Sequence, residues 1–257
     1  MSQQPLLQPT DLIASPRQIE VRGAFEKPDW YFRKLGFRIK VRQDVVKAFV
    51  AGKHFDNVLD IGCGDGSISR PLLAADTQVT FFDISEEMLR YVAEGIPSHL
   101  KTMATLLCGD FSEAQLAPEN FDLIICLGVV SYIDDLAGFF DKITKVLKPG
   151  GLLLLECSDG YHFLSRLSSA YSSLAHVFKP KTVGLRVRSR HEIFRALTQR
   201  SLHLEASYFY ASTPPGLRRL LSQDVQYKLI KLIHGQPPGN RCSWFGNECI
   251  YLLRRTQ

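Results

Sequence analysis

The feature that most constrains this chain is the stretch Val58–Ser69, which reads VLDIGCGDGSIS. An apolar run ends in an acid, and glycines follow at Gly62, Gly64 and Gly66 before a second apolar-periodic segment. This pattern predicts a buried strand, a tight turn and the start of a helix. Glycines are needed where the backbone passes close to a ligand, with angles that a side chain would forbid. The turn is therefore predicted to carry a nucleotide-like cofactor.

The glycine spacing and the neighbouring acids indicate which cofactor this is. A dinucleotide-binding turn reads G-x-G-x-x-G and offers a helix N-terminus to a pyrophosphate. Here the spacing is G-x-G-x-G, and Asp60 and Asp65 flank the turn. These acids would repel a pyrophosphate but suit a ligand that carries an ammonium and a sulfonium, such as S-adenosylmethionine. The next apolar run ends in Asp83, where a carboxylate can accept hydrogen bonds from both ribose hydroxyls.

These residues resemble the motif series of the class I S-adenosylmethionine-dependent methyltransferases, and the resemblance extends over roughly residues 57–157. Phe121–Asp135, FDLIICLGVVSYIDD, is similar to the fourth strand of the family and its active-site loop. Leu147–Glu156, LKPGGLLLLE, is similar to the turn and fifth strand that close the series. The resemblance implies S-adenosylmethionine as cofactor, with an adenine contact at Asp110 and Phe111.

An element before the first strand folds over the cofactor in many methyltransferases of small molecules. That resemblance implies Tyr31 as a residue that closes over the methionine moiety. Arg38 lies on the same helical face as Val41 and Val45, so it could point at the cofactor's carboxylate; the alternative for both residues is a plain surface position. The full set of predicted cofactor-binding residues is Tyr31, Arg38, Asp60, Gly62, Cys63, Gly64, Gly66, Asp83, Ile84, Asp110, Phe111 and Leu127.

Apolar runs and helix-period segments alternate along the chain, which predicts an α/β fold. Strands are expected near Asn57–Ile61, Gln78–Phe82, Thr105–Cys108, Leu123–Leu127, Leu152–Cys157, Leu202–Tyr210 and Trp244–Leu253. Helices are expected near Phe37–Gly52, Ser67–Ala74, Ser85–Glu94, Leu136–Leu147, Arg190–Arg200 and Pro215–His234. The alternation predicts a Rossmann-like, doubly wound sheet, mostly parallel, with helices on both faces. The resemblance implies seven strands, of which the last is antiparallel.

The 257 residues are predicted to form a single domain. Its parts are a polar N-terminal segment (1–29), a helical cap (30–56), the cofactor-binding core (57–157), a lid insertion over the substrate (158–190) and the C-terminal half of the sheet (191–257). In the lid, Phe163 and Leu167 begin an apolar stripe at helical spacing. The alternative is that this stripe is core that covers the sheet edge.

Composition is that of an ordinary globular protein, with 45% apolar residues, 22% charged residues and a net charge of +5. The six cysteines form no C-x-x-C, so neither a zinc site nor a disulfide framework is expected, and no metal is predicted. Reduced thiols favour a cytoplasmic location. The sequence shows no signal peptide and no apolar run long enough to span a membrane, so a membrane span is not expected.

The catalytic residues are the least constrained part of the sequence. Many relatives carry an acid and a histidine after the fourth strand, where this chain has Leu127, Gly128, Ser131 and Tyr132. An oxygen nucleophile often needs a base near the sulfonium. Tyr132, His162 and His191 are the candidates, and His162 is the best placed because it follows the fifth strand directly; the alternative is a structural histidine.

The predicted function is methylation of a small, partly apolar acceptor in a biosynthetic or tailoring pathway, with O-methylation favoured. N- or C-methylation is the first alternative, because it needs less of a base. A non-catalytic subunit that binds the cofactor is the second, and RNA methylation is the third. Nucleic acid is not expected as a partner, because LGVVSY stands where amino-directed nucleic-acid methyltransferases have an Asn/Asp-Pro-Pro-aromatic motif. The oligomeric state stays open.

The predicted ribose contact can be tested by Asp83→Ala. Loss of charge-assisted hydrogen bonds is expected to weaken S-adenosylmethionine binding by about 1.5–3 kcal/mol. Isothermal titration calorimetry measures this, with circular dichroism as the control for folding. Unchanged affinity in a folded variant would show that the ribose is held elsewhere.

Overall fold

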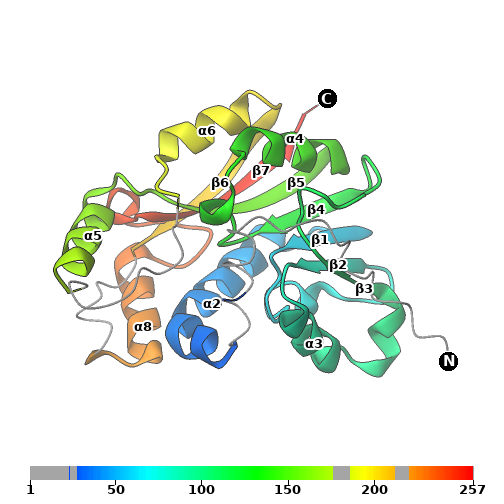
Figure 1. The fold of residues 1–257 in the computed structure, drawn as a ribbon, viewed down its shortest axis with the longest axis horizontal. Coiled ribbons are helices and arrows are strands. Elements are labelled where there is room, and N and C mark those ends of the chain that lie inside the picture. The colour runs from blue at the N-terminus through cyan, green and yellow to red at the C-terminus, as the bar shows by residue number, and fades with distance from the viewer. Residues whose placement is uncertain (1–22, 24–27, 176–185, 212–219, 257) are drawn as a thin grey trace.

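A seven-stranded sheet forms the centre of the computed structural model, which describes residues 23, 28–175, 186–211 and 220–256. The strand order is β3-β2-β1-β4-β5-β7-β6 (Figure 1). β1 to β5 pair in parallel, whereas β7 is antiparallel to both β5 and β6, so the predicted doubly wound sheet is confirmed. The strands are β1 (Asn57–Ile61), β2 (Gln78–Asp83), β3 (Ala104–Cys108), β4 (Phe121–Cys126), β5 (Leu147–Ser158), β6 (Leu202–Tyr210) and β7 (Glu248–Arg255).

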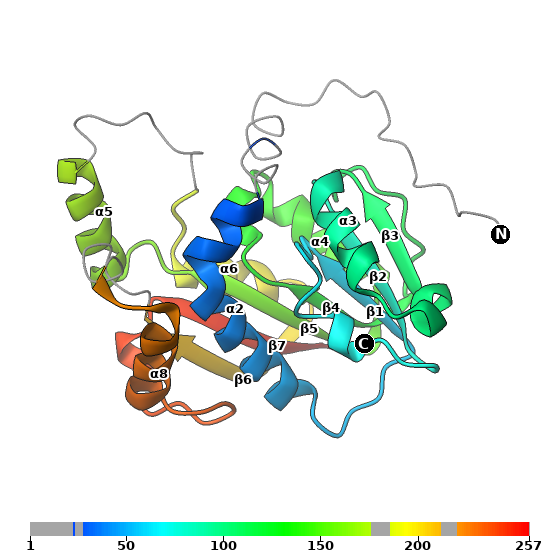
Figure 2. The same ribbon diagram turned by 90° about the horizontal axis from the view of Figure 1, so that it is seen from below.

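Helices cover both faces of this sheet (Figures 1 and 2). α2, α3 and α8 pack on one face, and α4 and α6 pack on the other. The helices are α2 (Pro28–Val50), α3 (Glu86–Gly95), α4 (Leu136–Val146), α5 (Phe163–Ala175), α6 (Arg190–Thr198) and α8 (Gln223–His234). Short 3₁₀ turns are η1 (Arg70–Leu72), η2 (Ser98–Met103), η3 (Val130–Tyr132) and η4 (Ser243–Phe245). α5 lies at the end of the molecule farthest from β3.

The central strands are buried on both faces, which explains why they read as continuous apolar runs. In β5, Leu154 faces α2 and α8, while Leu153 and Leu155 face α4 and α6, and all three are fully buried. The helix boundaries follow side-chain caps. Asp135 accepts a hydrogen bond from the backbone N–H of Gly138 at the start of α4, as its position before the apolar-periodic segment indicates.

The predicted helix at Ser67–Ala74 is wrong, because only the 3₁₀ turn η1 forms there. An α-helix from Ser67 would need a hydrogen bond from the backbone N–H of residue 71 to the carbonyl of Ser67. Pro71 has no N–H, and the Ser67 carbonyl accepts from the side chain of Gln43 at 3.0 Å instead. The long-range contact therefore replaces the first turn of the helix.

Other boundaries differ by a few residues. β7 begins at Glu248 rather than Trp244, because η4 occupies the positions before it. α2 begins at Pro28, ahead of the predicted start at Phe37. Part of the predicted helix at Pro215–His234 lies outside the described residues, and the described part is α8. In the described parts of the chain, no helix has the length and apolarity to cross a bilayer.

The buried position of Leu154 predicts a large stability loss for Leu154→Ala. The free energy of unfolding is expected to fall by about 2–5 kcal/mol, since apolar burial is lost and a cavity remains. Leu204→Ala is the matched control, because this leucine on β6 is 44% exposed and is expected to change the value by roughly 1 kcal/mol or less. Urea unfolding followed by circular dichroism measures both, and equal losses would contradict the assigned packing.

Candidate functional site

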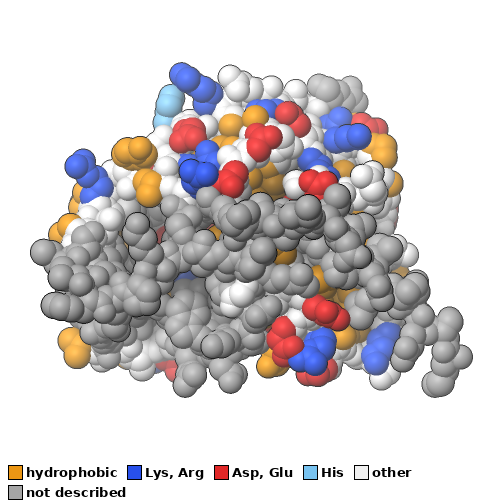
Figure 3. Space-filling view, viewed as in Figure 1, with side chains coloured by type: hydrophobic (Ala, Val, Ile, Leu, Met, Phe, Trp, Pro, Cys, Tyr) orange, Lys and Arg blue, Asp and Glu red, His pale blue; other side chains and the backbone are white. Residues whose placement is uncertain are grey.

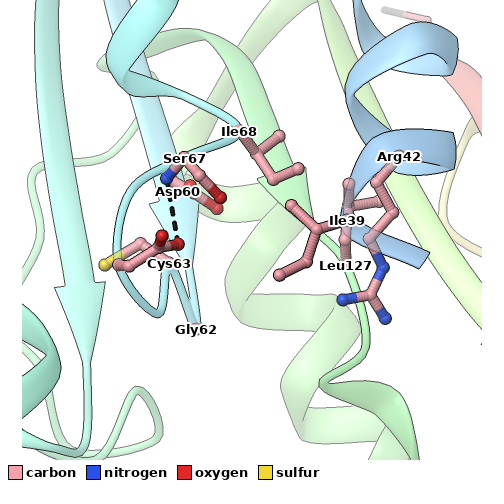
Figure 4. A pocket seen from close by; sticks show the side chains of 9 residues that line it. Ile39, Arg42, Asp60, Gly62, Cys63, Ser67, Ile68 and Leu127 are labelled. Carbon is pink, nitrogen blue, oxygen red and sulfur yellow. Dashed lines mark hydrogen bonds between the residues drawn. The ribbon is translucent and has the colours of Figure 1, made fainter. Parts of the chain in front are cut away.

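The sheet has a switch point between β1 and β4, where the strand order reverses direction. Ligands of open α/β sheets bind beyond the carboxyl ends of the strands at such a point. A pocket lies at this place (Figure 4), and the roughly 330 Å³ of space between its atoms includes open solvent. It is lined by Ile39, Arg42, Asp60, Gly62, Cys63, Asp65, Ser67, Ile68 and Leu127. Four of these, Asp60, Gly62, Cys63 and Leu127, are predicted cofactor residues.

The glycine turn forms the wall of the pocket next to β1. Gly62, Gly64 and Gly66 have φ angles of +68°, +55° and +70°, a region that other residues rarely adopt. A Cβ on Gly62 would also lie 2.4 Å from the side chain of Val129. The backbone N–H of Gly62 donates to the Phe82 carbonyl at 2.8 Å, which ties the turn to the end of β2. The turn can therefore keep this shape only with glycine.

Asp83 stands at the carboxyl end of β2 and is 7% exposed. Its two oxygens accept from the backbone N–H groups of Gly64, at 2.8 Å, and Ser85, at 2.9 Å. Burial raises the pKa of this carboxyl, and the two backbone donors act against that rise. A carboxylate has about four acceptor positions, so Asp83 keeps capacity for hydroxyl groups of a ligand.

Asp60 lies at the base of the pocket and is 3% exposed. The hydroxyl of Ser69 donates to it at 2.5 Å. Burial, with a smaller effect of the negative charges of Asp83 and Asp65, raises the pKa of Asp60 to about 7, against the opposing effects of Ser69 and Arg42. A cation bound in the pocket would favour the carboxylate form.

Arg42 and Glu156 form a buried ion pair that the sequence analysis missed. Arg42 reaches from α2 to the wall of the pocket (Figure 4) and donates to Glu156, at the carboxyl end of β5. Glu156 also accepts from the hydroxyl of Tyr210 on β6. Burial alone would raise the pKa of Glu156, but Arg42 and Tyr210 hold it below its usual value. This pair joins the helix over the site to the sheet below it.

Arg38 forms a second ion pair, with Glu248 of β7, at 2.8 Å. Glu248 also accepts from the hydroxyl of Ser158 at 2.5 Å. Arg38 is thus placed against β7, and it is Arg42, one helical turn later, that lines the pocket. Two sequence signals could have found this network. Arg38 and Arg42 share one helical face by their spacing of four, and Glu156 ends an apolar run as Asp60 and Asp83 do.

The remaining predicted cofactor residues lie around this centre. Asp110 accepts from the backbone N–H of Ser112 at 2.7 Å and from its hydroxyl at 2.6 Å. Phe111 is buried in an aromatic cluster, with ring centroids 5.8 Å from Phe82 and 5.4 Å from Phe139. Ile84, next to Asp83, is partly exposed. The backbone of Tyr31 belongs to α2, but its side chain lies outside the described part of the structure.

The three catalytic candidates lie on separate segments, and none of them lines the pocket. His162 uses both ring nitrogens: Nδ1 accepts from the backbone N–H of Leu164 at 3.3 Å, and Nε2 donates to the carbonyl of Trp244 at 3.0 Å. Tyr132 belongs to η3, directly after β4, and His191 is exposed in the first turn of α6. Across the described ranges, no group of three or more His, Cys, Asp or Glu residues is arranged to hold a metal ion.

The fold and the pocket define a Rossmann-like α/β protein with a pocket at its switch point, where ligands of such sheets bind. Residues 59–155 match the family model described as a methyltransferase domain. The chain is 30% identical over 106 residues to a malonyl-[acyl-carrier protein] O-methyltransferase of Chlorobium luteolum, and this alignment covers 40% of each chain. It is 27% identical over 134 residues to a ubiquinone biosynthesis O-methyltransferase of Hydrogenovibrio crunogenus, covering 52% of this chain and 51% of the relative.

Among solved structures, a magnesium protoporphyrin IX methyltransferase of Synechocystis PCC 6803 with bound SAH superposes with a TM-score of 0.64. The alignment covers 93% of this chain and all of that one, at 17% sequence identity. Residues 59–155 therefore match a methyltransferase domain within a fold shared with solved methyltransferases, in agreement with the resemblance that begins at Val58–Ser69. The matched part spans about two fifths to one half of the length of the curated relatives.

The raised pKa of Asp60 predicts a pH-dependent effect of Asp60→Asn. The folded protein holds a proton on Asp60 up to about pH 7, whereas the unfolded chain releases it near its usual pKa of 3.8, so burial of this group destabilises the fold as pH rises between these values. Relative to wild type, the variant is expected to gain on the order of 2–4 kcal/mol of unfolding free energy at about pH 8 and little at about pH 4.

Urea unfolding at the two pH values measures this gain. Ser69→Ala is the matched control, because loss of the donor raises the pKa of Asp60 further and so destabilises the protein more at the higher pH. A gain from Asp60→Asn that is equal at both pH values would contradict the assignment.

Proposed function

We propose that this chain is an S-adenosylmethionine-dependent methyltransferase of a small, partly apolar acceptor. The observation that carries the proposal is the arrangement of charge around the pocket. Asp60 and Asp65 lie on the side of the glycine turn, and Arg42 lies on the side of α2. The methionine moiety has an ammonium and a sulfonium, which suit the acids, and a carboxylate, which suits the arginine.

The same argument assigns the other parts of the cofactor. Asp83, at the end of β2, is proposed to accept from the ribose hydroxyls, and Asp110 from the adenine amine. The bound cofactor supplies an activated methyl group. The residues of this chain align it and exclude water, which is most of what an in-line methyl transfer requires of a protein. Ile39 of α2 and Leu127 after β4 provide the apolar walls for that role.

For the acceptor, we propose an alcohol, phenol or acid oxygen in a biosynthetic or tailoring pathway. Two relatives with O-methyltransferase in their names support this, as does the aromatic residue content of the segment proposed as a substrate lid, 158–190. Tyr132 and His191 remain the proposed bases, since both ring nitrogens of His162 hold neighbouring backbone groups. A nitrogen or carbon acceptor is the alternative, because it needs less of a base.

The proposal is tested by incubation of the protein with methyl-labelled S-adenosylmethionine and cell extract. The extract is then separated into small-molecule and nuclease-sensitive macromolecular fractions. Label is expected in the small-molecule fraction, where mass spectrometry and NMR identify the acceptor atom. Label only in RNA would overturn the proposed substrate class, and confirmed cofactor binding without transfer would support a non-catalytic subunit.

The same assay tests the role of His162. His162→Ala is expected to keep turnover within about a few-fold of wild type, because its ring nitrogens serve the backbone and not the pocket. Asp83→Ala is the control that should lose activity through cofactor binding. A large loss of kcat in His162→Ala, with unchanged cofactor affinity and stability, would restore His162 as the base. We further propose a cytoplasmic location and an acceptor other than nucleic acid.

A further inference from the structure

We infer that the α5 end of this protein docks on the surface of a membrane that contains anionic phospholipid. The inference goes beyond the proposed function and does not depend on it. Two observations carry it: a connected patch of exposed aromatic and aliphatic side chains, and exposed basic side chains beside it that form no ion pair within the described residues.

The patch extends from α5 to η4. Phe163 at the start of α5 is 50% exposed, and Leu167, one turn later, is 63% exposed. The Phe163 ring lies 5.7 Å from that of Phe245, which lies 5.5 Å from that of Trp244, and Trp244 is 72% exposed. Tyr161, just before α5, is 65% exposed. Phe163 and Leu167 therefore face solvent and do not cover the sheet edge; the positions of the predicted stripe beyond residue 170 lie outside the described side chains.

The sequence segments that contain α5, η4 and α8 have far more basic than acidic residues. Residues 160–191 contain six lysines and arginines and no acid. Residues 206–247 contain five lysines and arginines and one acid, Asp224, which pairs with Lys40. α5, η4 and α8, which belong to these segments, lie together at one end in both ribbon views. On the face seen in Figure 3, acidic and basic side chains are interleaved over α4 and α6 and beside α3.

The acids nearest in the chain to this end are paired. Asp159 lies 3.8 Å from Arg190, Glu192 pairs with Arg188, and Glu248 is buried against Arg38. Arg166 of α5 and Arg241 before η4 are exposed. Arg186 and Lys231 are balanced too, by Asp134 and Asp44. The positive charge beside the patch therefore comes from Arg166, Lys228 and Arg241, which are exposed and form no ion pair within the described residues.

A lipid surface fits both observations better than a compact partner does. Trp, Tyr and Phe side chains are favoured at the boundary between headgroups and acyl chains, where an amphipathic helix lies with its apolar side inward. An anionic leaflet is an extended plane, so it attracts basic residues that are spread over several segments. A discrete protein or nucleic acid would favour charge concentrated at one contact. The patch begins a few residues after β5, so docking would bring the carboxyl ends of the strands close to the lipid.

The test is sedimentation of the full chain with vesicles of phosphatidylcholine alone or mixed with phosphatidylglycerol. Binding is expected to the mixed vesicles, weaker to the neutral ones and reduced by added salt. The double substitution Phe163→Ser and Trp244→Ser is expected to lower the partition coefficient about tenfold or more, because two large apolar side chains are lost from the interface. Leu204→Ser is the matched control, since it removes an exposed apolar side chain at the far end of β6 and should bind as wild type.

Further variants and measurements distinguish a loss of vesicle binding from a loss of folding. The pair Tyr161→Ser and Leu167→Ser reports on the same patch through different positions, and circular dichroism with urea unfolding checks each variant. The chain has two tryptophans, so Trp30→Phe leaves Trp244 as a single reporter whose emission should shift to shorter wavelength on mixed vesicles.

Absence of wild-type binding to mixed vesicles would overturn the inference, as would equal binding by the folded double variants. Capture of an acidic protein by this face, or a dimer that dissociates in the double variant, would also overturn it if vesicles do not bind. None of these readouts involves methyl transfer, so failure of the proposed function would leave the outcome unaffected.

Discussion

The buried ion pair between Arg42 and Glu156 is the contact on which the site depends. The two side chains are 8% and 2% exposed, so removal of either partner would leave a charge in a medium that solvates it poorly. Each charge therefore fixes the position of the other, and the hydroxyl of Tyr210 donates a further hydrogen bond to Glu156. Because Arg42 belongs to α2 and Glu156 to β5, the pair holds the N-terminal helix over the carboxyl ends of the central strands and closes the pocket from above.

The opposite wall of the pocket has the reverse charge. Asp60, Asp65 and Asp83 lie around the glycine turn, and burial together with mutual repulsion disfavours the charged form of Asp60. The protein thus keeps carboxyl groups at a free-energy cost that a cationic ligand would offset. An arginine on one side and carboxyl groups on the other give the pocket a polarity along which a zwitterionic ligand has one favourable orientation.

The pocket and the exposed patch that begins at α5 are both connected to β5. The strand carries Glu156 into the pocket, and after Ser158 the chain leaves toward α5, whose exposed apolar side chains form no part of the core. A helix that packs its apolar face outward loses the burial that normally stabilises helices. A surface that covers this face would supply the missing burial. Because α5 follows β5 closely in the chain, such a surface would lie near the pocket at the carboxyl end of β5.

The sequence by itself determined the sheet, the glycine turn and the acids at the ends of β1 and β2. β1 has the predicted bounds because the apolar residues Val58, Leu59 and Ile61 mark a strand that is buried on both faces, and the angles at Gly62 are a local property of the chain. Only the tertiary structure decided that Arg42 rather than Arg38 lines the pocket and that His162 serves two backbone groups. These outcomes depend on partners distant in sequence, Glu156 and Trp244, and local patterns carry no information about which distant groups will meet. The missing α-helix at Ser67–Ala74 is different, because Pro71 is a local signal against it.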